Sequence, residues 1–170
     1  IGPLTIAKNA AGKDSAAIDG ASELEMKIPA VLNVPSVTFK RSFAVGYSTM
    51  MLPFSVSEEN LPDGLEFYSF DEVEEIDGKY TAKYTAASVV EANKPYIVKN
   101  SGESALSQVT FNGEFTLKTD FPASSSSSNG WEFKGTYEYK SWEEGDEGLG
   151  KTYGFAGSAG NDPKIVGQFA

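Results

Sequence analysis

The chain has 170 residues, enough for one domain with a substantial hydrophobic core, and its 24 acidic and 14 basic residues give a formal net charge of −10. This negative field repels phosphate backbones and anionic lipid headgroups, so we expect no nucleic-acid partner. The sequence contains neither His nor Cys, which excludes disulfides, thiolate metal sites and the Ser-His-Asp triad. No stretch approaches the roughly 20 apolar residues that span a bilayer, and we expect no membrane insertion.

Apolar and polar residues alternate along most of the chain, a period of two that is typical of half-buried β-strands. Residues 24–28 alternate strictly between apolar and charged side chains, which predicts a strand. From Val37 to Val56 apolar residues again recur at every second position, and only Arg41 breaks the first part of this pattern. We interpret this stretch as two strands, or as one long strand bent near Gly46.

The middle of the chain contains a predicted hairpin and a predicted bulge. Residues 65–70 and 79–85 are rich in β-forming residues, and an acidic stretch that ends in Asp77-Gly78 separates them as an irregular tip. Asn112-Gly113 is a strong hairpin signal. A turn there would nevertheless pair apolar with polar side chains, whereas a straight reading places Val109, Phe111, Phe115 and Leu117 on one face. We therefore predict one strand with a bulge at Gly113.

Proline and serine mark two further positions. Pro95 should open a strand over 95–99, because proline cannot donate within a ladder. Residues 124–128 form a serine-rich loop, after which 131–140 shows the clearest alternation in the sequence and predicts a strand. Helical signals are sparse, with a single turn predicted at 57–61.

Short strands separated by turn residues predict an all-β fold, an antiparallel β-sandwich or jelly-roll-like architecture with little or no helix. We divide the chain into an N-terminal β appendage or linker strands at 1–35 and a β-sandwich domain at 36–170. Because the sequence begins at Ile1 without a methionine or a signal-like segment, we interpret it as part of a longer polypeptide.

Four segments occur in the order expected for one known domain: residues 47–54 (YSTMMLPF), 67–70 (FYSF), 91–98 (EANKPYIV) and 131–137 (WEFKGTY). With them, the chain resembles a recurrent β-rich accessory domain of large secreted and cell-surface proteins of gut and rumen anaerobic bacteria. The resemblance implies a secreted or cell-surface location, neighbouring domains of the same polypeptide as partners, and no established catalytic residues. That family closes with a further strand after the Gly-Gln-Phe position, here 167–169, so we expect the last C-terminal strand to be missing.

Aromatic residues in the 131–140 segment provide the first candidate site. Trp131, Phe133, Tyr137 and Tyr139 share one face and could stack against sugar rings, although a core face is the simpler interpretation and the one we favour. Trp142 lies on the polar face beside charged residues, where an exposed ring could bind carbohydrate or the ring could lie under the adjacent loop. The candidate carbohydrate ligands are thus Trp142, Tyr137 and Tyr139.

A second candidate is a calcium site in the acidic loop that follows. Glu143, Glu144, Asp146 and Glu147 supply the carboxylate oxygens that calcium prefers, but they do not follow the EF-hand order. An ordinary solvated loop is the alternative, and it is the one that we favour. No other cofactor is expected.

These observations favour a noncatalytic accessory or structural module of a secreted or surface-anchored bacterial protein. One alternative is a carbohydrate-binding module that uses the aromatic residues above on a polysaccharide. Another is a protein-interaction or adhesion module in which an open edge strand accepts a strand from a surface protein. Acidic pairs are unavoidable among 24 carboxylates and carry no information about glycoside hydrolysis, so we expect no enzyme activity.

Overall fold

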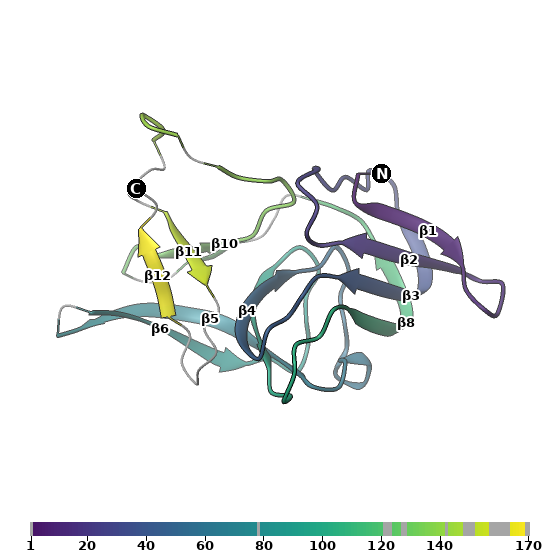
Figure 1. The fold of residues 1–170 in the computed structure, drawn as a ribbon, viewed down its shortest axis with the longest axis horizontal. Coiled ribbons are helices and arrows are strands. Elements are labelled where there is room, and N and C mark those ends of the chain that lie inside the picture. Colours follow the sequence, from purple (N-terminus) through teal and green to yellow (C-terminus); the bar gives the residue numbers. More distant parts are fainter. Residues whose placement is uncertain are drawn as a thin grey trace.

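The computed structural model describes residues 2–77, 79–120, 124–126, 129–141, 143–147, 152–156 and 164–168. Over these ranges the fold consists of strands and one short 3-10 turn, which confirms the predicted all-β sandwich (Figure 1). The elements are β1 (Leu4–Lys8), β2 (Asp14–Asp19), β3 (Leu32–Lys40), β4 (Gly46–Met51), η1 (Glu58–Asn60), β5 (Leu65–Ile76), β6 (Lys79–Ala86), β7 (Pro95–Asn100), β8 (Val109–Leu117), β9 (Ser124–Ser126), β10 (Glu132–Lys134), β11 (Tyr153–Ala156) and β12 (Lys164–Gln168). None of the described segments forms a helix with the length and apolar character needed to cross a bilayer.

The first layer of the sandwich is a sheet with the order β1-β2-β3-β8. β1 and β2 form an antiparallel hairpin, and β3 pairs antiparallel with β8. β2 and β3 run parallel, with Ala16 opposite Val37, which differs from the purely antiparallel sheet predicted from the sequence. The difference arises because the chain crosses back through residues 20–31 before β3 begins, so both strands start at the same end of the sheet.

The second layer is a sheet with the order β4-β7-β5-β6, in which every neighbouring pair is antiparallel. The break at 41–45 between β3 and β4 confirms that two strands, and not one bent strand, occupy this stretch. Pro95 opens β7 as predicted, and β5 and β6 form the predicted hairpin. The predicted irregular acidic tip is wrong, because the acidic residues 71–75 belong to β5 and the ladder continues to Ile76. The outer half of this hairpin pairs only within itself and projects beyond the sandwich (Figure 1).

The predicted bulge in β8 is confirmed. Val34 pairs with Phe115 and Ser36 with Asn112, so β8 contains one more residue than β3 between these pairs. Gly113 sits in the bulge with φ +147°, a backbone conformation that side-chain-bearing residues rarely adopt. Phe111 and Phe115, on either side of the bulge, are both buried.

A single hydrophobic cluster joins the two layers. At its centre the ring of Phe54 lies 5.4 Å from that of Phe111 and 4.9 Å from that of Phe115, between centroids. The cluster also contains Ala16 and Ile18 from β2, so the N-terminal strands share this core with later ones. The boundary predicted at residues 35 and 36 is not tested by these contacts alone and stays a prediction.

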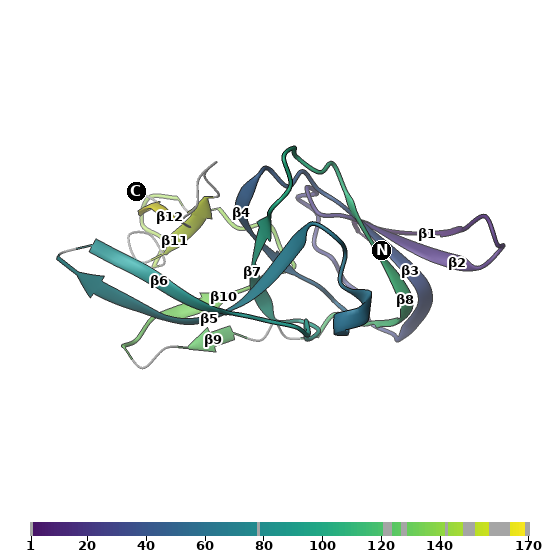
Figure 2. The same ribbon diagram turned by 90° about the horizontal axis from the view of Figure 1, so that it is seen from below.

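The second sheet also has a buried outer face. Tyr47 and Ile97 are only 7% and 2% exposed, yet neither belongs to the main cluster. Ile97 pairs with Thr49, so Ile97 and Tyr47 lie on the same face of the sheet as Thr49, the outer face. Residues 129–141 cover part of this face, with the ring of Phe133 5.7 Å from that of Phe70. β9 contacts β5, β11 contacts β4 and β12 contacts β6, so the C-terminal part forms further layers on this sheet (Figure 2).

Two predicted strands are wrong in their hydrogen bonding. Residues 24–28 are not part of a sheet, although Met26 and Ile28 are buried and Leu24, Glu25 and Lys27 exposed. In the 131–140 segment only β10 is a strand. At 24–28 the alternation correctly predicts which side chains are buried, but no neighbouring strand completes a ladder. At 132–134 β10 pairs with β9, and beyond it the segment leaves strand geometry.

Replacing Ile18 tests whether the N-terminal strands belong to the cooperative core. Ile18 is 1% exposed, so we expect Ile18→Ala to lower the free energy of unfolding by about 2 to 5 kcal/mol in chemical denaturation. Ile6→Ala in β1, where the side chain is 41% exposed, is the control and should change stability by only about 0.5 kcal/mol. An Ile18→Ala protein whose main transition does not move would show that residues 1–35 unfold separately.

Candidate binding groove

A groove of about 420 Å³ runs between the N-terminal crossover, the end of β4, the start of β7 and the C-terminal segment 133–140. Its volume lies in the range of about 300 to 1,000 Å³ that is usual for ligand pockets. Its apolar lining residues include Leu24, Met51, Pro95, Phe133 and Tyr137. Polar and charged side chains line the rest of the groove, so it combines an apolar surface with hydrogen-bonding groups.

The C-terminal wall approaches the sheet closely because of a glycine. A Cβ atom on Gly135 would lie 2.3 Å from Sδ of Met51, much nearer than real Cβ contacts. Any larger residue would therefore push the segment away from β4 or force the Met51 side chain to move. Gly135 thus sets the width of the groove on this side.

Tyr137 attaches the same wall to the core. Its hydroxyl donates a hydrogen bond to Oδ1 of Asn93 at 2.6 Å, and its carbonyl accepts one from the Met26 N–H at 2.9 Å. The ring packs against the main hydrophobic cluster. Burial raises the pKa of the Tyr137 phenol, so the phenol stays neutral and its hydroxyl can donate the hydrogen bond to Asn93.

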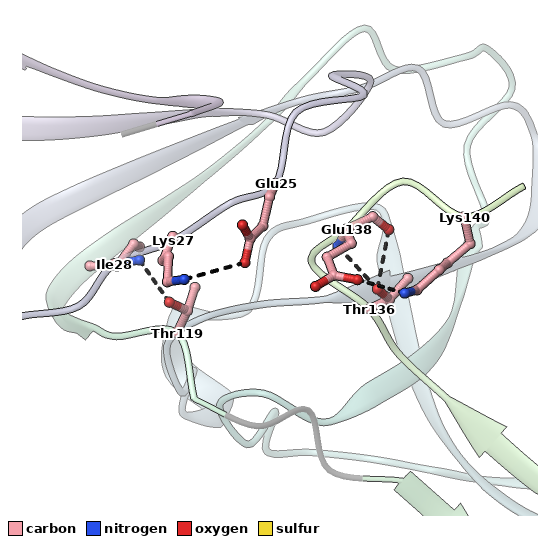
Figure 3. Close-up of polar contacts among 7 residues, drawn as sticks. All are labelled: Glu25, Lys27, Ile28, Thr119, Thr136, Glu138 and Lys140. Carbon is pink, nitrogen blue, oxygen red and sulfur yellow. Dashed lines mark hydrogen bonds and ion pairs between the residues drawn. The ribbon is translucent and has the colours of Figure 1, made fainter.

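The rim beyond Tyr137 is polar and ordered by local contacts (Figure 3). Thr136 Oγ1 accepts a hydrogen bond from the Glu138 N–H at 3.0 Å, and Lys140 Nζ lies 2.5 Å from Glu138 Oε2. The ammonium group of Lys140 lowers the pKa of the Glu138 carboxyl. Tyr139 lies between these residues in sequence and is 61% exposed, so a ligand in the groove can reach its ring.

Arg41 lines the groove from the β3–β4 connection. Its Cζ atom lies 4.5 Å from the ring centroid of Phe43 and 5.9 Å from that of Phe39, within the range of cation–π contacts. Nη2 donates to the carbonyl of Thr49 and lies 3.4 Å from Oγ of Ser48. Burial lowers the pKa of the guanidinium, which nevertheless remains protonated at any physiological pH.

The sequence-predicted carbohydrate residues fall into three groups. The structure brings Tyr137 and Tyr139 to one groove, Tyr137 as part of the wall and Tyr139 on the rim. Trp142 lies outside the described residues. The expected core face is wrong for Tyr139, which is exposed, whereas Trp131 and Phe133 are half-buried against the β5–β6 hairpin.

The acidic loop is exposed in its described part. Glu143, Glu144, Asp146 and Glu147 all face solvent, and Oδ2 of Asp146 accepts a hydrogen bond from the Glu143 N–H at 2.9 Å. Over the described ranges of the chain, no three acidic side chains converge as a metal site would require. The described part of this loop gives no geometric support for a calcium site, and the calcium hypothesis stays a prediction.

Sequence reasoning did not assign a role to Arg41. Its position could have indicated a role, because Arg41 is the one charged residue in a run of apolar residues at every second position from Val37 to Tyr47. It also missed a cluster of tyrosines, Tyr47, Tyr68 and Tyr84, whose ring centroids lie 5.0 to 6.4 Å apart on the outer face of the second sheet.

No family model, no curated protein and no solved structure matches the chain. Its function must therefore be inferred from the groove and from the residues that line it.

One member of the tyrosine cluster, Tyr68, has a raised pKa. Tyr68 donates a hydrogen bond to Glu66, which raises the pKa of Tyr68 from 10.0 to about 12. Ser101 donates to the same carboxylate, and these two bonds lower the pKa of Glu66. The Tyr68 shift stabilises the fold below about pH 10 and is lost as the pH rises through about 12, whereas the Glu66 shift is lost as the pH falls through its lowered pKa.

We expect Glu66→Ala to return the pKa of Tyr68 towards 10.0, because the carboxylate that holds the phenol proton is removed. Site-resolved NMR titration of the tyrosine ring carbons measures this shift. Ser101→Ala is the control, since it weakens only the second bond to Glu66 and should leave Tyr68 near its raised value. An unchanged Tyr68 titration in Glu66→Ala would contradict the assignment.

Tyr137→Phe removes the hydroxyl that binds Asn93 but keeps the ring in place. We expect the free energy of unfolding to fall by about 1 kcal/mol, because Oδ1 of Asn93 loses its shortest hydrogen bond. Urea denaturation measures the change. Tyr139→Phe alters an exposed hydroxyl and should be neutral, so equal effects of the two substitutions would disprove the anchoring role of Tyr137.

Proposed function

We propose that this chain is a noncatalytic accessory module that binds carbohydrate through the groove between β4 and residues 133–140. The observation that carries the proposal is the exposed ring of Tyr139 on the rim of a groove that has both apolar and hydrogen-bonding walls. A pyranose ring presents C–H groups on its faces and hydroxyls at its edge. An aromatic ring beside polar groups is complementary to both.

The polar groups of the rim suit hydroxyl recognition. Thr136, Glu138 and Lys140 offer hydrogen-bond donors and acceptors within one short segment, and their mutual contacts hold them in position (Figure 3). Such pre-organisation reduces the conformational entropy that these side chains lose when a ligand binds. The ordered rim thus supports binding of a polar ligand.

One observation favours binding over hydrolysis. Glycosidases need a general acid whose pKa is raised, whereas Lys140 lowers the pKa of Glu138 in the groove. The proposal requires no cofactor.

The proposed setting is a secreted or surface-anchored bacterial protein, in which neighbouring domains of the same polypeptide are the structural partners. Support comes from the resemblance carried by residues 47–54, 67–70, 91–98 and 131–137, and from the acidic composition of the chain. In that setting the module would hold its parent protein near a polysaccharide.

Removing the Tyr139 ring tests the proposal directly. We expect the wild-type chain to be retarded in affinity gels that contain polysaccharide, and Tyr139→Ala to bind about 3- to 10-fold more weakly because one stacking contact is lost. Tyr80→Ala is the matched control, since Tyr80 is 49% exposed but lies outside the groove. Unchanged mobility of the wild-type chain in gels of cellulose, xylan and pectin would contradict binding to these polymers, and a wild-type chain that also binds no short oligosaccharide would refute carbohydrate binding.

A further inference from the structure

We propose that the groove selects a negatively charged sugar residue, and that Arg41 binds its anionic group. The ligand class is a sugar that bears a carboxylate, as in a uronic acid, or a sulfate ester. This inference rests on the proposed carbohydrate function, and it names the chemistry of the ligand at the same groove.

Arg41 has no counter-charge among the described side chains. In the described part of the chain Arg41 takes part in none of the ion pairs within 4.0 Å. Its described hydrogen bonds both leave from Nη2 and both end on neutral oxygens, of Thr49 and Ser48. A guanidinium carries five N–H donors, so donors on Nη1 and Nε remain for a ligand.

Burial makes this arrangement costly without an anion. Arg41 is largely desolvated in a groove with apolar walls, where an uncompensated charge is unfavourable. A carboxylate or sulfate that enters the groove would supply the missing charge. Such charge-assisted bonds are among the strongest that a protein makes, and the planar guanidinium can make two of them in parallel.

The local balance of charge in the groove also favours an anionic ligand. The side chains that line the groove include three cations, Arg41, Lys134 and Lys140, and two anions, Asp19 and Glu138. This balance is the reverse of the whole chain, which has 24 acidic and 14 basic residues. The two lysines are matched locally, Lys140 with Glu138 at 2.5 Å and Lys134 with Glu132 at 2.9 Å, so Arg41 is the cation left for a ligand.

The Arg41 side chain is also held in place before a ligand binds. The rings of Phe43 and Phe39 lie within 4.5 and 5.9 Å of the Arg41 Cζ atom, and Nη2 is attached to the backbone of β4 through Thr49. These contacts restrict the side chain before any ligand arrives. Little conformational entropy is then lost on binding, which favours selection by Arg41 over a flexible surface lysine.

The acidic character of the rest of the chain limits the size of the ligand. With a formal net charge of −10, the protein repels a long polyanion, most strongly at low salt. Short oligosaccharides with one or a few anionic residues avoid most of this repulsion. We therefore expect oligosaccharides to bind more tightly per anionic residue than the corresponding polymers.

The test is isothermal titration calorimetry of the full chain with three sets of short oligosaccharides: uronic acid, sulfated and neutral. We expect the wild-type protein to bind at least one anionic set about tenfold or more tightly than the neutral set. Arg41→Gln should abolish this preference while neutral sugars bind as before, and Arg41→Lys should restore part of it. Lys8→Gln removes one charge on β1, outside the groove, and should leave the preference unchanged.

The results separate this inference from the proposed function. A wild-type protein that binds neutral and anionic sets equally overturns only the role of Arg41, as does an Arg41→Gln protein that keeps the preference. Absence of binding to all three sets overturns both proposals. If Arg41→Gln does not fold, the wild-type comparison of anionic with neutral sets still decides, and the set that binds more tightly shows whether the group is a carboxylate or a sulfate.

Discussion

Burial of β7 on both of its faces is the constraint on which the rest of the structure depends. Tyr96, Ile97 and Val98 are consecutive, and each is 2% exposed or less. Tyr96 and Val98 belong to the core between the two sheets, whereas Ile97 faces the other way. The second sheet must therefore be covered on its outer face as well. The C-terminal segment 129–141 provides part of that cover, and the groove forms where this segment meets the N-terminal crossover.

Local features of the fold could be predicted from the sequence. Proline at the start of β7, the bulge at Gly113 and the β5–β6 hairpin each depend on neighbouring residues, and all three predictions are confirmed. Hydrogen-bond partners were harder to predict, because alternation reports which side of an extended chain is buried and not whether another strand lies beside it. Residues 24–28 and 131–140 show this difference, and so does the parallel pairing of β2 with β3.

The candidate site was predictable in part for the same reason. The aromatic alternation at 131–140 drew attention to Tyr137 and Tyr139 but assigned both to one face of a strand, although only Tyr137 packs against the core. The chain leaves strand geometry after β10, so the parity no longer determines which ring is buried. Arg41 could not be placed in the groove from sequence, because the wall formed by residues 133–140 comes from a distant part of the chain.

The pairing of β3 with β8 determines the order in which this molecule can assemble. Thr38 and Thr110 face each other across these strands, 72 residues apart in sequence, and their hydroxyls lie 3.1 Å apart. A chain that emerges N-terminus first from a ribosome or an export channel must hold β3 unpaired on that edge until β8 has followed. Closing so long a loop is entropically costly and slows folding. The apolar side of β2 and β3 would meanwhile be open to chaperones or to unwanted association with other chains.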